Sequence, residues 1–133
     1  MNMQNRELDH IGVATPHIEK TSAWLESLGF KLKGAFMSGK VPCRFFTNGH
    51  VCYELYQPED MKGDRARIEH VSYVSHDIEA DYAQCMHDGF TCTTDGIESL
   101  DFWENGCRFF KIGSPTGEEI EFDQLLPLEG ANK

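Results

Sequence analysis

The chain contains one stretch twice, and this repeat constrains the fold more than any other feature. Residues 8–13 read LDHIGV and residues 68–73 read IEHVSY, so each copy starts with an apolar residue, an acidic residue, a histidine and a branched apolar residue. The match continues without a gap as far as Gly29-Phe30, which corresponds to Gly89-Phe90. Internal repetition decides the architecture before any local assignment. Because the unit is half the chain, we interpret the protein as a duplicated module and not as a solenoid.

The two copies align again in their second halves. The triplet RFF occurs at residues 44–46 and 108–110, and ELYQ at 54–57 corresponds to EFDQ at 121–124. The spacing between the first and second alignments differs, so we expect the loops of the two modules to differ in length.

Hydrophobic and turn patterns predict one strand, one helix and three strands in each copy. In the first copy, Thr15-Pro16 predicts the helix start and Gly29 its end, because threonine is a favoured N-cap, proline suits the first helical position and glycine allows the left-handed stop. The Asn48-Gly49 pair predicts a hairpin. The expected strands are 8–13, 30–35, 41–47 and 50–56, then 68–74, 90–94, 107–112 and 119–125, with the second helix at about 75–88. Module one is expected at about 6–60 and module two at about 66–126, within a single domain of 1–133.

Composition and charge exclude several classes of partner. The chain has 133 residues, enough for about one domain's core, and its formal charge of −10 disfavours binding to nucleic acid or to anionic membranes. There is no apolar run suited to a signal peptide or a membrane span, so we expect a cytoplasmic protein. The five cysteines form no Cys-x-x-Cys pair, and we expect reduced, mostly buried thiols.

Four residues form the candidate site, because each module carries a histidine on its first strand and a glutamate on its last. These are His10 and Glu54 in the first module, and His70 and Glu121 in the second. A single strand histidine is more often structural than a ligand, but matched pairs in both copies favour a divalent metal site. Imidazole and carboxylate together suit nickel, zinc or cobalt, and also manganese or iron. The other four histidines, expected at the surface, are His17, His50, His76 and His87.

The strand assignment places three basic residues near the same cleft. Arg44, Arg108 and Lys111 would hold an anionic group of a substrate, or would pair with the many surface acids. The sequence favours neither alternative.

The repeats resemble the vicinal oxygen chelate superfamily, which includes glyoxalase I, methylmalonyl-CoA epimerase, bleomycin-resistance proteins and extradiol dioxygenases. The matching segments are LDHIGVATPHIEK at 8–20, IEHVSYVSHDIEA at 68–80 and SPTGEEIEF at 114–122. The resemblance implies an α+β fold in which two βαβββ modules form a curved mixed sheet around a metal. It further implies that His10, Glu54, His70 and Glu121 are the metal ligands, and that the protein is a homodimer that binds a small molecule.

Bacterial glyoxalase I is the most similar branch by ligand set, since methylmalonyl-CoA epimerases usually carry glutamine where Glu54 stands. This resemblance implies a metal-dependent lyase or isomerase, similar to lactoylglutathione lyase, that moves a proton next to a metal-bound carbonyl or hydroxyl. Either ligand glutamate could be the base, and we favour Glu121 over Glu54. The arginine and asparagine that bacterial glyoxalase I uses for glutathione are replaced by Ala14 and Pro58. We therefore predict a different thiol adduct, an acyl thioester or a hydroxycarbonyl compound as substrate.

Three other activities stay open at this stage. One is an epimerase-like isomerase, and another is an iron(II) dioxygenase that uses two histidines and one glutamate. A third is a metal-free protein of the binding or resistance type. The substrate, the native metal and the assembly do not follow from the sequence.

Overall fold

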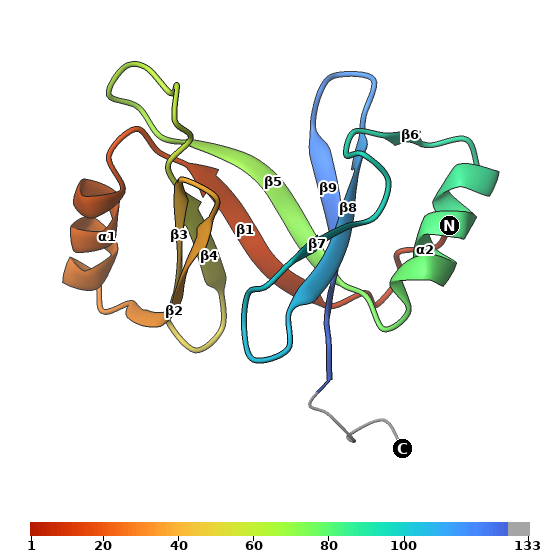
Figure 1. Ribbon diagram of the computed structural model, residues 1–133, viewed down its shortest axis with the longest axis horizontal. Helices are drawn as coiled ribbons and strands as arrows, with labels where there is room; N and C mark the ends of the chain where they lie inside the picture. Colours follow the sequence, from red (N-terminus) through yellow and green to blue (C-terminus); the bar gives the residue numbers. More distant parts are fainter. Residues whose placement is uncertain (128–133) are drawn as a thin grey trace. The chain divides into compact units, whose positions relative to one another are not determined.

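The computed structural model describes residues 1–127, and its contacts divide the chain into two compact units. One unit is His10–His70, and the other combines Met1–Asp9 with the chain from Val71 onward (Figure 1). The single domain of 1–133 and its module limits stay predictions, and the last six residues of that range lie outside the described part.

The first module has the predicted order of one strand, one helix and three strands. Its elements are β1 (Leu8–Ala14), α1 (Ile18–Ser27), β2 (Lys31–Ser38), β3 (Val41–Thr47) and β4 (Cys52–Tyr56). The strands lie in the order β2-β3-β4-β1. The β2–β3 and β3–β4 pairs are antiparallel, and β1 runs parallel to β4. The sheet of this module is therefore mixed, as predicted.

The second module repeats this order with one interruption. Its elements are β5 (Arg67–Val74), α2 (Ile78–His87), β6 (Thr91–Cys92), β7 (Glu98–Leu100), β8 (Cys107–Gly113) and β9 (Glu119–Leu125). Strands β6 and β7 pair with successive parts of β8, whose other edge pairs with β9. Strand β7 lies between the expected strands 90–94 and 107–112, so the first of the three strands is split in two. The two βαβββ modules are thus confirmed.

The start predicted for the first helix is wrong by two residues. Thr15 does not cap α1; its hydroxyl accepts a hydrogen bond from the His17 N–H in the turn that precedes the helix. The helix begins at Ile18, whose N–H donates to the side-chain oxygen of Gln57 at 2.9 Å. The residue that follows the last strand of the module therefore supplies a cap that local sequence rules do not detect.

The second helix uses the equivalent glutamine in the same way. The Ile78 N–H donates to the side-chain oxygen of Gln124 at 2.9 Å, and the Asp77 side chain accepts from the Ala80 N–H. Gln57 and Gln124 end the repeated ELYQ and EFDQ segments. This shared cap gives one physical reason for the repeat to extend into the last strand.

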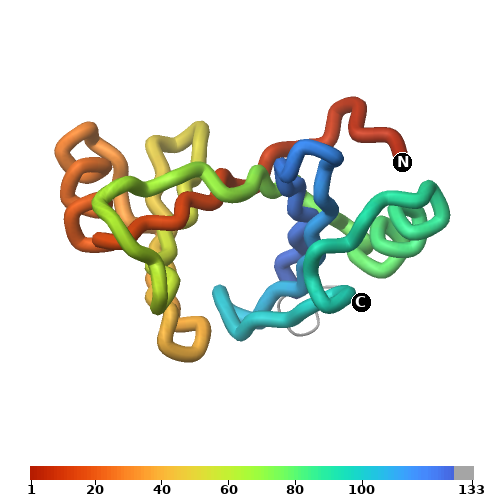
Figure 2. The backbone as a smooth tube through the Cα atoms, turned by 90° about the horizontal axis from the view of Figure 1, so that it is seen from above, coloured from red at the N-terminus to blue at the C-terminus, as the bar shows by residue number. Residues whose placement is uncertain are grey.

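Each helix packs against one face of the sheet of its own module, as Figures 1 and 2 show. In the first module the buried core residues are Ile18, Leu25, Phe46 and Leu55. In the second they are Ile78, Cys85, Phe110, Ile112 and Phe122. Since side chains alternate across a strand, the residues between these core positions point to the face without the helix. The candidate ligands Glu54 and Glu121 each precede a core residue, and so belong to that face.

The remaining general predictions about side chains hold. All five cysteines are free thiols and four of them are buried. The four other histidines are exposed. Among residues 1–127 no helix combines the length and apolar character needed to cross a membrane.

Candidate metal centre

Three of the four predicted ligands meet within the unit His10–His70. His10 lies on β1, Glu54 on β4 and His70 in the first part of β5. Gly12 pairs with Glu54 in the β1–β4 register, and alternation places His10 on the same side of β1 as Gly12. Val13 and Leu55 point to the opposite side, where they pack beneath α1. The alternation that places apolar side chains beneath the helix therefore also places the candidate ligand side chains on the other face of the sheet.

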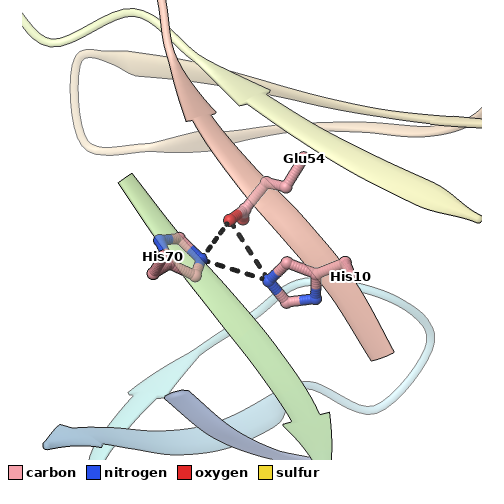
Figure 3. Close-up of side chains that lie close together, drawn as sticks. All are labelled: His10, Glu54 and His70. Carbon is pink, nitrogen blue, oxygen red and sulfur yellow. Dashed lines mark hydrogen bonds and ion pairs between the residues drawn. The ribbon is translucent and has the colours of Figure 1, made fainter. Parts of the chain in front are cut away.

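The three ligand atoms form a nearly equilateral triangle (Figure 3). His10 Nε2 is 3.3 Å from His70 Nε2. Glu54 Oε1 is 3.4 Å from His10 Nε2 and 3.3 Å from His70 Nε2. Nitrogen and oxygen ligands bind zinc at about 2.0–2.2 Å, so two ligands of one ion are about 3.0 Å apart at a right angle and about 3.4 Å apart at the tetrahedral angle. The observed spacing matches the ligand set of one small cation.

The chemistry of the three atoms also requires positive charge between them. A carboxylate oxygen only accepts, and the unprotonated nitrogen of a neutral imidazole also presents a lone pair. The side chains are only 3%, 12% and 3% exposed for His10, Glu54 and His70. Water therefore does little to offset their mutual repulsion. A proton or a metal ion must satisfy such a buried group of acceptors, and the residues fit a divalent metal.

The ionisation of Glu54 is consistent with this role. Burial alone would raise its pKa, but hydrogen bonds and charge attraction from His10 and His70 in their protonated form outweigh burial and lower the pKa to about 2. The carboxylate is therefore ionised at neutral pH. Burial, followed by the nearby charge of Glu54, raises the pKa of Cys43 to about 12. Cys43 is a neutral thiol and adds no charge to the site.

Aromatic side chains surround the two histidines. The Phe45 ring meets His10 edge-on at a centroid distance of 5.6 Å, and Phe36 meets Phe45 at 6.0 Å. The Tyr56 ring lies 6.3 Å from the His70 ring. This apolar wall lowers the local dielectric and strengthens electrostatic interactions within the site.

His70 has two further neighbours that sequence reasoning missed. Its Nδ1 forms a hydrogen bond with the carboxylate of Glu69. A Cβ atom placed on Gly12 would lie 2.0 Å from Cε1 of the His70 ring, so only glycine leaves room for the ring at this point of β1. The acidic residue before each repeated histidine was a visible signal for Glu69. Gly12 appeared in the sequence only as an interruption of an apolar strand.

The fourth predicted ligand, Glu121, belongs to the other unit. It lies in the middle of β9, is 5% exposed and pairs in register with Lys111 of β8. Its position within the second module is equivalent to that of Glu54 in the first, since each lies mid-strand on the face opposite the helix. Its place in the ligand set stays a prediction.

Two of the three basic residues considered for substrate binding instead form hydrogen bonds with side chains on the helices. Arg44 donates to Glu19 and, at 3.1 Å, to the Ser22 hydroxyl, both on α1. Arg108 donates to Glu79 of α2 at 3.1 Å. Pairing with surface acids is therefore the correct alternative for these two arginines.

The fold and the cluster define an α+β protein of paired βαβββ modules with a possible His-Glu-His metal site. The chain belongs to the Glyoxalase/Bleomycin resistance protein/Dioxygenase superfamily, whose family profile matches residues 9–118. The predicted resemblance to this superfamily is confirmed. Most of its members are metal-dependent enzymes.

Several solved structures share the fold. A hypothetical protein from Bacillus halodurans C-125 is 23% identical, with a TM-score of 0.74 over 94% of this chain and 98% of that chain. Methylmalonyl-CoA epimerase from Mycobacterium tuberculosis is 18% identical, with a TM-score of 0.74 over 91% and 89%. The Mn(II)-bound glyoxalase from Novosphingobium aromaticivorans is 16% identical, with a TM-score of 0.62 over 90% and 38%. At these identities the likeness concerns the fold alone. No curated protein sequence shows significant similarity to the chain.

Proposed function

We propose that the protein is a metal-dependent lyase or isomerase of the glyoxalase I type, which transfers a proton at a carbon next to a carbonyl or hydroxyl group. The observation that carries this proposal is the buried triangle of His10 Nε2, Glu54 Oε1 and His70 Nε2, with sides of 3.3–3.4 Å. Glu121 is proposed as the fourth ligand. This assignment rests on its equivalence to Glu54 in the other module. Nickel, zinc or cobalt suits the ligand set best, and manganese and iron are alternatives.

A bound divalent cation would act as a Lewis acid that stabilises negative charge developing on the substrate oxygen. The residues of the chain supply the rest of the chemistry. Oxygen Oε1 of Glu54 faces both imidazoles, so this carboxylate is committed to the ligand set. We assign the proton transfer to Glu121, the proposed ligand that lies outside this triangle of contacts. A positioned general base of this kind contributes typically about 10²–10⁴-fold to the rate.

The surroundings of the site favour a substrate other than a glutathione adduct. Ala14 is fully buried on β1, and neither Ala14 nor Pro58 can offer the charge or amide that glutathione recognition uses in the similar enzymes. Arg44 and Arg108 are already paired with helix carboxylates. The aromatic wall of Phe36, Phe45 and Tyr56 instead suits an apolar group beside the reacting carbonyl. An acyl thioester, as in an epimerase-like reaction, or a hydroxycarbonyl compound fits these features.

A second candidate function is supported by one specific observation. Within the unit His10–His70, the ligand cluster consists of two histidines and one carboxylate, which is the ligand set of many non-haem iron(II) oxygenases. An iron dioxygenase would need positions for oxygen and substrate, and so would not use Glu121 as a ligand. The role of Glu121 therefore separates the two candidates.

Metal analysis of protein purified without added metal provides the first test. Nickel, zinc or cobalt near one ion per chain supports the lyase or isomerase, and absence of metal supports a metal-free binding protein. Iron fits either activity, and the oxygen-consumption test below then separates them. His70→Ala should abolish the bound metal, while His87→Ala is the matched control because His87 is exposed.

Proton exchange provides the second test. Candidate thioesters and hydroxycarbonyl compounds are incubated with the metal-loaded protein in D₂O, and loss of the adjacent C–H signal is followed by ¹H NMR. Glu121→Gln should slow exchange by at least about 10²-fold if Glu121 is the base. Oxygen consumption without proton exchange would refute the lyase or isomerase and favour the oxygenase.

A further inference from the structure

The two nitrogens of the His70 ring face different partners. Nε2 is 3.3 Å from both His10 Nε2 and Glu54 Oε1, whereas Nδ1 contacts the carboxylate of Glu69. A carboxylate has lone pairs and no proton to donate, so Nδ1 must be the donor in this hydrogen bond. In the neutral ring the proton then lies on Nδ1, which leaves the lone pair of Nε2 directed at the metal site.

Glu69 is in turn held by a residue of β4. A hydrogen bond with Glu69 is one of the causes that raise the pKa of Tyr56, and because a carboxylate only accepts, the Tyr56 hydroxyl is the donor. Burial, together with the negative charge of Glu69, raises the pKa of Tyr56, so the hydroxyl keeps the proton that it donates. The Glu69 side chain is only 17% exposed. The carboxylate is therefore fixed between a phenol and an imidazole.

The Glu69 contact is not a by-product of strand geometry. Successive side chains on a strand point to opposite faces, so a neighbour such as Glu69 would ordinarily point away from the ring of His70. On its other side the ring lies against the backbone of β1 at Gly12, where a Cβ atom would overlap it. The His70 ring is thus confined by Gly12 on β1, Tyr56 on β4 and Glu69 on β5.

We propose that Glu69 is a positioning residue that fixes the Nδ1–H tautomer and the orientation of His70, and that Tyr56 orients Glu69. This inference rests on the proposed metal function for its purpose, though not for its geometry. Histidine ligands of metals commonly donate their second ring nitrogen to a carboxylate, and loss of that partner typically costs about 10–100-fold in metal affinity or activity.

The first experiment measures the tautomer directly in metal-free protein. Imidazole ¹⁵N NMR at a pH of about 9, above the usual imidazole pKa, should show that His70 carries its proton on Nδ1. Glu69→Gln, which keeps an acceptor oxygen, should retain this tautomer, whereas Glu69→Ala should move the proton to Nε2 or give a mixture. An Nε2–H tautomer in the wild-type protein would overturn the proposal, whether or not the variants fold.

The second experiment titrates cobalt(II) into the metal-free proteins by calorimetry. We expect Glu69→Ala to raise the Kd by about 10–100-fold, and Tyr56→Phe to raise it by a smaller factor. Glu59→Gln is the charge-matched control, because Glu59 is exposed in the same unit, and it should leave the Kd unchanged. Equal Kd values for Glu69→Ala and this control would also overturn the proposal. If the wild-type protein binds no cobalt, the proposed metal function fails, while the NMR result still decides the role of Glu69.

Discussion

Replacement of Gly12 by alanine tests the close contact between β1 and the His70 ring. The added Cβ would lie 2.0 Å from Cε1 and 2.4 Å from each ring nitrogen. Carbon atoms in contact are about 3.5–4.0 Å apart, so the ring would have to retreat by about 1.5 Å. Metal–ligand distances tolerate only about 0.2 Å. The substitution should therefore remove His70 from the metal site while leaving its imidazole intact.

The magnitude for stability follows from two opposed effects. Forcing an extra carbon into a packed site costs about 1–3 kcal/mol. Alanine in place of glycine also restricts the unfolded chain, which stabilises by about 0.4–1 kcal/mol where the native backbone accepts it. All three of the nearest atoms to the added Cβ belong to His70. In a His70→Ala background the clash is absent, so Gly12→Ala should there be neutral or slightly stabilising.

A double-mutant cycle measures this difference. Urea unfolding of the wild-type protein, both single variants and the double variant, all metal-free, should give an interaction energy of about 1–3 kcal/mol between the two positions. Cobalt binding to Gly12→Ala should be weaker than to the wild-type protein by at least about 10-fold. If Gly12→Ala destabilises both backgrounds equally, the cost has another origin and the reasoning from the ring contact is wrong.

Three further predictions concern the ligands, the substrate and pH. His70→Ala should lower the metal content and abolish the rise in Tm on adding metal, because metal at 100 times the Kd adds about 2.7 kcal/mol to the free energy of unfolding. Unchanged metal content would contradict the ligand assignment. Ala14 and Pro58 cannot form two charge-assisted hydrogen bonds of about 1.5–3 kcal/mol each. The methylglyoxal–glutathione hemithioacetal should therefore react with a kcat/KM about 10²–10⁴-fold below that of an efficient glyoxalase I. A kcat/KM near 10⁷ M⁻¹s⁻¹ in steady-state kinetics with nickel-loaded protein would refute this. Burial alone would raise the pKa of Asp81, but hydrogen bonds from Arg6 and Ser75 lower that pKa below the usual 3.8. The ionised Asp81 carboxylate therefore stabilises the fold above pH 3.8, and this stabilisation is lost as the pH falls further. Asp81→Asn should therefore reduce the loss of Tm as the pH falls from about 5 to about 2, and identical profiles for variant and wild type would contradict the ion pair with Arg6.

The sequence by itself determined the two βαβββ modules and singled out His10, Glu54 and His70, which the structure brings together as a possible metal site. The repeat predicted two βαβββ modules because the same apolar periodicity and the same glycine stops occur in both halves. Gly29 and Gly89 have positive φ angles of 93° and 85°, as a helix stop requires. The matched histidines and glutamates could be recognised because residue type and strand position are local properties.

Tertiary structure decided the features that depend on contacts between distant residues. The first N–H of each helix donates a hydrogen bond to the side-chain oxygen of Gln57 or Gln124, and these residues come 39 and 46 positions later in the chain. Arg44 and Arg108 form ion pairs with the helices, because a glutamate on each helix lies opposite each arginine. Spacing along the chain gives no information about a 3.3 Å approach between His10 and His70, or about the space that Gly12 leaves for a ring. Such distances depend on how strands far apart in sequence pack side by side, and this packing is a property of the folded chain.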